Sequence, residues 1–221
     1  MYNREKFINS IQESFNNYLS YGKRSNKRIL PIHNYIAETV EQIFGNEYEV
    51  FCSGKNKEIK VKGKYYNKNI DITLTKDSNP IFCIGVKFIT SNFKQNSNNY
   101  FESMLGETAN IQSNNNIPYA HIIILRTDTP YYNKDGTIER IEQITESDIN
   151  KYLKLYYDSA VTHKPFAIAI MFVEERENII KESLPSINPE IIEILKNNLS
   201  VERLFQNITD FKYYHKNIGE F

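Results

Sequence analysis

The chain has 221 residues, with 27 basic and 27 acidic side chains and two cysteines. This length fits one domain, and a net charge of zero gives no argument by itself for a nucleic-acid or membrane partner. Two cysteines argue against a disulfide framework. The first 22 residues are amphipathic and polar, unlike a signal peptide or a membrane span, so we expect a cytoplasmic protein without a membrane partner.

Apolar periodicity predicts helices alternating with strands. Helices are expected at about 3–20, 32–44, 98–112, 146–160, 188–198 and 200–208. Strands are expected at about 47–53, 57–66, 69–76, 81–89, 120–126 and 166–173. The strands up to residue 89 form an antiparallel meander in this interpretation, and residues 66–69 turn one strand back on the next. The strand, helix and strand over 81–126 imply a right-handed crossover.

Lys87 is the residue that most needs an explanation. It lies near the end of the run 81–89, which is otherwise apolar and is typical of a strand buried on both faces. A buried ammonium is costly unless acidic groups pair with it. Asp71 is the candidate partner, since strict alternation over 70–76 places it on the polar face of the preceding strand. An Asp on one strand and a Lys on the next is half of a metal-dependent phosphodiesterase site.

This arrangement resembles the PD-(D/E)XK nuclease superfamily over about residues 32–126, and the segment 92–112 looks like part of some type II restriction endonucleases. The resemblance implies an α/β fold, a restriction-endonuclease-like sandwich in which helices flank a mixed central sheet. We expect a single domain over 1–221, with a C-terminal α/β extension from about 140 to 221. In such enzymes the Asp and a second carboxylate hold Mg²⁺, and the Lys orients or activates the attacking water.

One position departs from the family pattern. The family places an acid two residues before the lysine, and this chain has Gly85 there. Three explanations compete: the acid has moved to another element, the protein has lost activity, or Gly85 is a deliberate substitution. For a moved acid, Glu102 near the start of the following helix is favoured over Glu107, which is more than one turn further on. The candidate metal ligands are therefore Asp71 and Glu102, and Glu107 is kept as a further catalytic candidate.

Two segments are candidates for contact with DNA. The first is a set of lysines on one face of an expected strand, Lys60, Lys62 and Lys64, which can follow a phosphate backbone. The second is the segment 91–100, expected to join the lysine strand to the next helix and rich in amides that can bond to adenine edges. Its candidates are Asn92, Lys94, Gln95, Asn96 and Asn98, with Lys94 as a phosphate contact.

The resemblance therefore implies a Mg²⁺-dependent, sequence-specific endonuclease of type II restriction type that hydrolyses double-stranded DNA. We expect a homodimer, because cutting both strands of a palindromic duplex needs two sites related by a two-fold axis. Gly85 favours an alternative, a catalytically inactive DNA-binding or regulatory protein with the same fold. A partner-binding domain without nucleic acid is a third interpretation. The sequence contains no zinc-binding pattern and no Gly-rich phosphate loop.

Overall fold

The computed structural model describes residues 2–22, 25–114, 116–159 and 162–218. The helices are α1 (Arg4–Tyr21), α2 (Leu30–Phe44), α3 (Phe93–Gln112), α4 (Glu146–Tyr157), α5 (Pro189–Asn198) and α6 (Val201–Ile218), with a short 3₁₀ helix η1 (Asn26–Arg28). The strands are β1 (Glu49–Cys52), β2 (Lys60–Lys62), β3 (Asn67–Asn69), β4 (Ile72–Lys76), β5 (Asn79–Ile89), β6 (Tyr119–Arg126), β7 (Asp128–Tyr132), β8 (Ile138–Gln143), β9 (Ala167–Arg176) and β10 (Ile179–Glu182).

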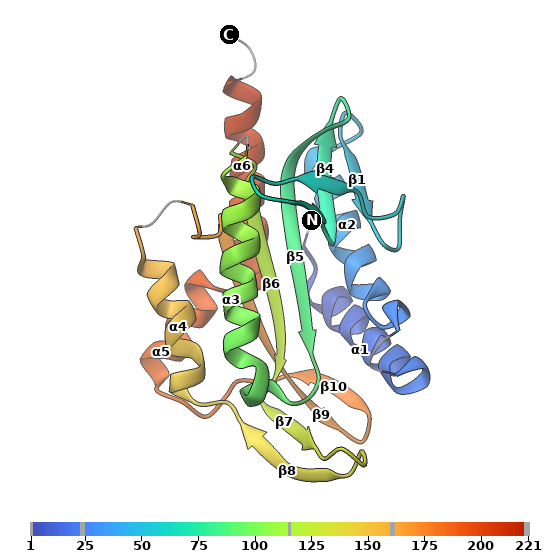
Figure 1. The fold of residues 1–221 in the computed structure, drawn as a ribbon, viewed down its shortest axis with the longest axis vertical. Coiled ribbons are helices and arrows are strands. Elements are labelled where there is room, and N and C mark those ends of the chain that lie inside the picture. The colour runs from blue at the N-terminus through green and yellow to red at the C-terminus, as the bar shows by residue number, and fades with distance from the viewer. Residues whose placement is uncertain (1, 23–24, 115, 160–161, 219–221) are drawn as a thin grey trace.

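A six-stranded mixed sheet forms the centre of the described structure, in the order β1-β4-β5-β6-β9-β10 (Figure 1). The strands β5, β6 and β9 are parallel to one another, and the outer pairs are antiparallel. Two small antiparallel sheets, β2 with β3 and β7 with β8, lie outside it. The helix α3 connects β5 to β6, because two parallel neighbours cannot be joined by a tight hairpin.

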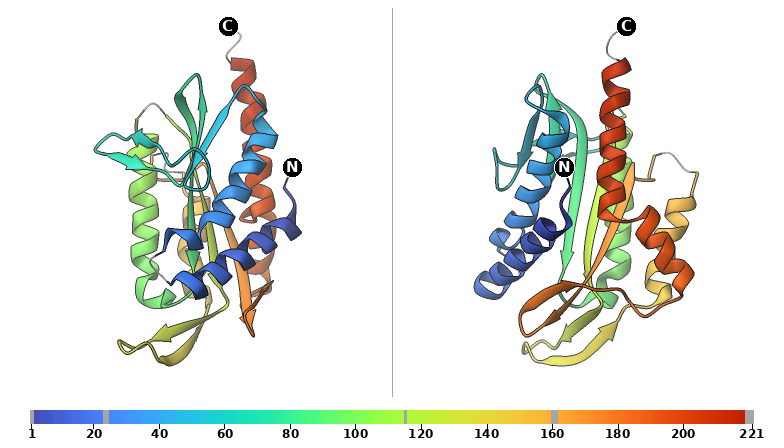
Figure 2. Two further views of the ribbon diagram at one scale, coloured as in Figure 1. Left: turned by 90° about the vertical axis from the view of Figure 1, so that its right-hand side faces the viewer. Right: turned by 180° about the vertical axis from the view of Figure 1, so that it is seen from behind.

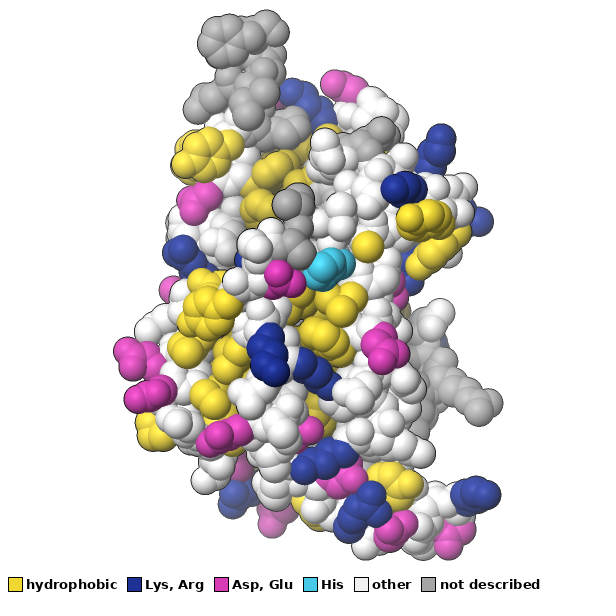
Figure 3. Space-filling view, turned by 60° about the vertical axis from the view of Figure 1, so that its left-hand side comes forward, with side chains coloured by type: hydrophobic (Ala, Val, Ile, Leu, Met, Phe, Trp, Pro, Cys, Tyr) yellow, Lys and Arg dark blue, Asp and Glu magenta, His cyan; other side chains and the backbone are white. Residues whose placement is uncertain are grey.

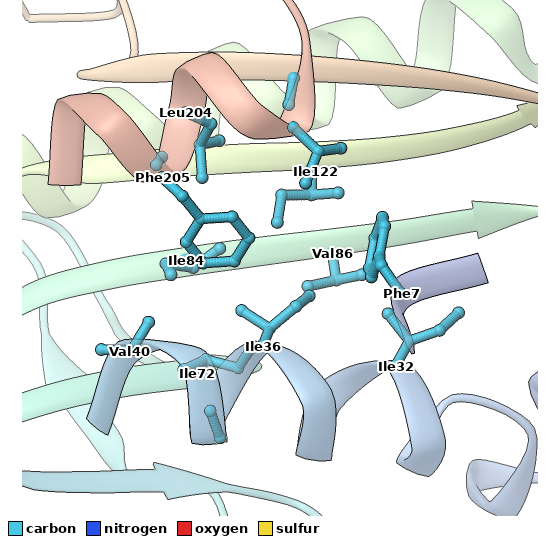
Figure 4. Packing of buried hydrophobic residues seen from close by; sticks show 14 of the residues in the cluster. Phe7, Ile32, Ile36, Val40, Ile72, Ile84, Val86, Ile122, Leu204 and Phe205 are labelled. Carbon is cyan, nitrogen blue, oxygen red and sulfur yellow. The ribbon is translucent and has the colours of Figure 1, made fainter. Parts of the chain in front are cut away.

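Helices cover both faces of this sheet, which Figure 2 shows nearly edge-on with α3 on one side and α1, α2 and α6 on the other. The larger core lies under α1, α2 and α6, where Ile84, Val86 and Ile122 pack against Ile36 and Phe205 (Figure 4). A second core lies under α3, α4 and α5. Successive strand residues point to opposite faces, so Gly85 and Lys87 belong to the α3 side of the sheet.

The α/β class and the mixed sheet flanked by helices agree with the sequence-based expectation, and β1, β4 and β5 form its antiparallel meander. One strand of the meander was wrongly placed. The segment 57–66 contributes only β2, which pairs with β3 in a separate sheet, and β1 pairs directly with β4. The hairpin is thus an insertion between two neighbouring strands of the central sheet.

The start of α3 also differs from the expectation. The segment 91–100 is not a connecting loop, because α3 begins at Phe93, directly after Asn92 in the left-handed region with φ of 52°. Phe93 is fully buried in the core under α3, and this burial stabilises the amide-rich first turns as helix. Further along, α6 extends to Ile218, and β7, β8 and β10 were not expected.

The outer edge of β10 is covered by α1. The side-chain amide of Gln12 donates to the carbonyl oxygen of Asn178 at 2.9 Å and accepts from the backbone N–H of Ile180 at 2.7 Å. Arg4 adds an ion pair to Glu182 with an Nε–Oε2 distance of 2.6 Å. Across the described ranges, none of the helices combines the length and apolar character needed to cross a membrane.

Candidate functional site

Asp71 is held at the entrance to β4 by the backbone of the neighbouring strand. Its Oδ2 accepts a hydrogen bond from the N–H of Val86 at 2.7 Å. The register explains this contact, because Ile72 pairs with Ile84 and the antiparallel ladder therefore carries Asp71 toward Gly85. The backbone thus fixes one carboxylate oxygen and leaves the other for a ligand.

Lys87 opens into the same hollow as Asp71. The hollow has a volume of about 460 Å³, and its lining includes His33, Ser53 and Glu58. Lys87 is half-buried near the end of β5, as the sequence predicted. Within the described part of the chain, the ion pairs include neither Lys87 nor Asp71. The strand pair therefore places a carboxylate and an ammonium group in the lining of one hollow, and neither forms an ion pair with another described residue.

Glu58, which the sequence interpretation did not select, is a second acid in this hollow. It lies in the connection between β1 and β2 and is half-buried. Burial raises the pKa of its carboxyl, and the negative charge of Asp71 raises it further. A signal for it did exist, since Glu58 is the only acid among six lysines in the segment 55–68. A half-buried carboxyl group whose ionisation is opposed by a neighbouring carboxylate forms, together with that neighbour, a place where a cation is stabilised.

The donor chemistry of Glu58 and Asp71 fits a divalent cation such as Mg²⁺. Mg²⁺ prefers oxygen ligands and is usually bound by one or two carboxylates, with waters and substrate phosphates completing the shell. In the described ranges, no three His, Cys, Asp or Glu side chains form a ready-made cage. The site therefore offers Glu58 and Asp71 as the residues that can hold the ion, and the remaining ligands would come from solvent and substrate.

Glu107 lies at the edge of this region rather than in the hollow. Its Oε1 is 2.9 Å from Nζ of Lys68, and its Oε2 accepts from the hydroxyl of Tyr119 at 3.3 Å. Burial raises the pKa of Tyr119 well above its ordinary value, and the neighbouring Glu107 raises it further. Tyr119 is therefore a neutral donor that connects Glu107 to the sheet.

The structure reverses the geometric preference for Glu102 over Glu107. Met104 and Thr108 face the sheet, and Thr108 is hydrogen bonded to His121, the residue that pairs with Gly85 in the parallel ladder. Glu102 is two residues before Met104, about 200° around the helix, and is exposed. Its charge acts on Lys151 of α4. The chain rises less than half as far per residue in a helix as in a strand. More residues of α3 are therefore needed to return to the height of Gly85, and the helix residue beside Gly85 comes later in the sequence than Glu102.

The space beside Gly85 is filled by two aromatic side chains. A Cβ atom added at this position would lie 2.8 Å from Nδ1 of His121 and 2.9 Å from the hydroxyl of Tyr119. His121 is buried, and this burial, together with the nearby charges of Lys87 and Lys68, lowers its pKa to about 3. The ring is consequently neutral. The position at which the PD-(D/E)XK pattern has an acid is thus closed by Tyr119 and His121.

The predicted DNA-contacting lysines lie on the small hairpin. Lys60 and Lys62 are exposed on one face of β2, and Val61 between them is buried. Lys64 follows the strand and is also exposed, with its backbone N–H bonded to the carbonyl oxygen of Asn110 at 2.8 Å. All three side chains are exposed to a phosphate backbone, and Nζ of Lys64 lies 5.4 Å from the centre of the Tyr65 ring. The strand is shorter than expected and carries only Lys60 and Lys62.

The amide-rich candidates instead contact α4, the β7–β8 hairpin and one another. Their partners are Tyr132 for Asn92, Asp148 for Lys94, Asn92 for Asn96 and Lys151 for Asn98. Gln95 lines a hollow formed with residues 131–135. Four of the five candidate side chains therefore already make polar contacts within the fold. These contacts stabilise the start of α3.

One other hollow of similar size has different chemistry. It has a volume of about 640 Å³, lies between α3 and α4 and is lined by Phe101, Leu105, Leu153 and Tyr157 with Lys151 at its side. Figure 3 shows apolar side chains between lysine and arginine side chains on this face. The lining of this hollow includes one carboxylate, Asp158, whereas the hollow around Asp71 has two.

Comparisons with known proteins add nothing to this geometry. No protein-family model, no curated protein and no solved structure matches the chain. The candidate site therefore depends on the residues themselves.

Proposed function

We propose that this protein is a Mg²⁺-dependent nuclease that hydrolyses phosphodiester bonds in double-stranded DNA, of the type II restriction kind. The observation that carries the proposal is the hollow shared by Asp71, Glu58 and Lys87. None of these three groups, two carboxylates and one ammonium, has an ion-pair partner among the described residues. This combination matches what phosphodiester hydrolysis requires: oxygen ligands for a hard cation and a fixed positive charge beside the phosphate.

Each residue has a distinct task in this proposal. Asp71 and Glu58 would hold Mg²⁺, which as a Lewis acid stabilises negative charge on the phosphoryl oxygens. Lys87 orients the attacking water and offsets the charge that develops on the phosphate during in-line displacement. The lysines of β2 and its turn, Lys60, Lys62 and Lys64, bind the DNA backbone. A homodimer in the cytoplasm is part of the proposal, because symmetric cutting of both strands requires two sites.

The test is incubation of purified protein with plasmid DNA in Mg²⁺ and, separately, in a chelator. We expect Mg²⁺-dependent nicked or linear products from the wild type and none from Asp71→Asn. Lys181→Ala, which removes an exposed lysine of β10 at the far edge of the sheet, is the matched control and should cut normally. Wild-type protein that leaves every DNA intact in Mg²⁺ would overturn the proposal.

The second candidate is a DNA-binding or regulatory protein that has lost cleavage. Tyr119 and His121 favour it, because they fill the space in which the family's second acid would project from the strand. It predicts retention of plasmid DNA in a gel-shift assay without any cutting in Mg²⁺. The plasmid experiment therefore separates the two candidates.

A further inference from the structure

The β2–β3 hairpin begins and ends beside the two candidate metal ligands. Glu58 comes two residues before β2, and Asp71 comes two residues after β3. The backbone N–H of Ile70 donates to the carbonyl oxygen of Ile59 at 3.3 Å and closes the base of the hairpin. Val61 is buried, and its two neighbours on β2 are exposed lysines. The hairpin therefore has one face packed on the protein and one face turned to solvent.

The tip of the hairpin is held by one buried side chain at the end of α3 (Figure 2), that of Asn110. Oδ1 of Asn110 accepts from the backbone N–H groups of Tyr65 and Tyr66 at 2.9 Å and 3.3 Å. Nδ2 donates to the carbonyl oxygen of Tyr66 at 2.9 Å, and the backbone carbonyl of Asn110 accepts from the N–H of Lys64. A Cβ at Gly63 would lie 2.1 Å from Nδ2, so a side chain there would displace the amide. The backbone of the tip is thus fixed in one shape.

This fixed tip presents two aromatic rings to solvent. Tyr65 is 76 % exposed, and Tyr66 is 52 % exposed. Aromatic rings contribute much of the energy of cores and interfaces when they are buried. A partner that covers these rings would not have to order the backbone that carries them, and this pre-organisation lowers the cost of binding. The tip therefore has the properties of a binding surface.

The charges around the two rings indicate the kind of partner. Residues 60–69 contain four lysines and no acid. Lys68 is paired with Glu107 on the packed side, and the other three lysines are exposed. Proteins that bind single-stranded nucleic acid combine positive charges along the phosphate backbone with aromatic rings on which the bases stack. The hairpin has both components on one short element.

We propose that the tip of the β2–β3 hairpin binds unpaired bases of DNA, with Tyr65 and Tyr66 each stacking on one base. The exposed lysines Lys60, Lys62 and Lys64 bind the phosphates of the same strand. This inference shares the DNA partner of the proposed function, but it requires neither the cation nor cleavage. The stacking surface is a separate site, since the two candidate metal ligands lie at the base of the hairpin.

The experiment measures the Kd of a fluorescein-labelled single strand of about 12 thymidines by fluorescence anisotropy in EDTA, with the melting temperature of every variant recorded. Tyr65→Ala and Tyr66→Ala should each raise this Kd by at least about fivefold, the lower end for the loss of one stacked base. Tyr65→Phe and Tyr66→Phe keep the ring and should stay within about twofold of the wild type. Tyr213→Ala, which removes an exposed ring on α6, is the matched control and should leave the Kd unchanged.

Two further measurements separate stacking from charge. The alanine variants should keep the wild-type dependence of affinity on salt, because a ring displaces no counterions. They should also change the Kd of a duplex of the same length by less than about twofold, because the bases of a duplex are already stacked on one another. An equal loss of affinity for both forms of DNA would mean that the rings do not select unpaired bases, and it would overturn the inference.

The remaining outcomes keep the two proposals apart. Wild-type affinity of both alanine variants for the single strand, or a wild-type protein that binds only the duplex, overturns the inference while the nuclease stands. Wild-type protein that binds neither form of DNA overturns both proposals. Tyrosine-dependent binding of the single strand without cleavage of plasmid DNA supports the inference and rejects the nuclease.

Discussion

Oδ2 of Asp71 and the backbone N–H of Val86 are 2.7 Å apart, so the acid is tied to the residue that directly precedes Lys87. The two charged groups therefore keep their relative position as long as β4 and β5 stay paired. Pre-organisation of this kind is what gives an electrostatic site its effect, because no energy is spent in arranging the groups during the reaction.

Lys87→Ala should lower the rate of plasmid cleavage by at least ~100-fold, the usual scale for the loss of one electrostatic stabiliser. Affinity for DNA should change little, because many other phosphate contacts remain. Single-turnover cleavage and a gel-shift titration measure the two quantities separately. Cleavage at the wild-type rate would remove Lys87 from the site.

Glu58→Gln should abolish Mg²⁺-dependent cleavage as completely as Asp71→Asn, since either change leaves the cation with one carboxylate. Glu102→Gln should cut normally, because Glu102 is exposed on the side of α3 away from the sheet. Glu107→Gln should mainly lower stability by weakening its contact with Lys68. If Glu102→Gln abolished cutting and Glu58→Gln did not, the original choice of Glu102 as metal ligand would be restored.

Gly85→Ala should destabilise the protein by about 1–3 kcal/mol, the usual cost of overpacking, because its methyl group meets His121 and Tyr119. Gly85→Glu should cost more and should not create activity. Gly106→Ala, in α3 with no atoms within 4 Å of the added methyl group, is the control and should be neutral or stabilising. Urea unfolding measures all three. A stable Gly85→Glu protein with raised cleavage would show that Gly85 stands in place of a catalytic acid.

The stability of the protein should fall as the pH is lowered from 6.5 toward 3. His121 has a pKa of about 3 in the folded state and an ordinary value of 6.5, so within this window the unfolded chain binds a proton that the folded chain does not. The full difference corresponds to about 5 kcal/mol at the low end. His121 faces Lys87 and Lys68, whose charges act in the same direction. Chemical unfolding of the wild type and of His121→Gln across these pH values should show a shallower loss in the variant, and parallel curves would contradict the assignment.

Replacing Lys60, Lys62 and Lys64 together by Gln should weaken binding to all DNA sequences and flatten the dependence of affinity on salt. The slope should change by roughly one unit for each lysine that binds a phosphate in the wild type. The exposure of all three side chains on the hairpin is the reason. Fluorescence anisotropy at several salt concentrations measures the slope, with Lys181→Gln as the control. An unchanged slope would mean that this face points away from DNA.

The sequence was most informative where one physical signal was strong. Alternation placed Asp71 at the start of a strand, and the apolar run around Lys87 identified the longest strand, because burial on both faces leaves a nearly continuous apolar pattern. The β7–β8 hairpin was missed although residues 133–136 form a typical Asn-Lys-Asp-Gly turn. Half of the residues of β8 are charged, and its two isoleucines are three positions apart, so the strand lacks the alternation of an apolar face.

The candidate site was harder to predict, because it depends on distances between segments that are remote in the sequence. Glu58 lies in a connection whose path is set by the contacts of Ser53 with His33 and of Gly54 with α2, and no local pattern encodes them. Likewise, the choice between Glu102 and Glu107 depended on the level at which α3 passes Gly85. That level follows from packing against the sheet rather than from helical periodicity alone.

The amide of Gln12 has a consequence for assembly. By giving Asn178 a donor and Ile180 an acceptor, it occupies the outward backbone groups that another strand would otherwise pair with. Exposed strand edges are the usual route by which sheets join or aggregate, and a side chain that mimics a neighbouring strand blocks that route. Pairing of a second copy with this end of β10 is therefore hindered, and a symmetric pair is expected to form through another surface of the chain.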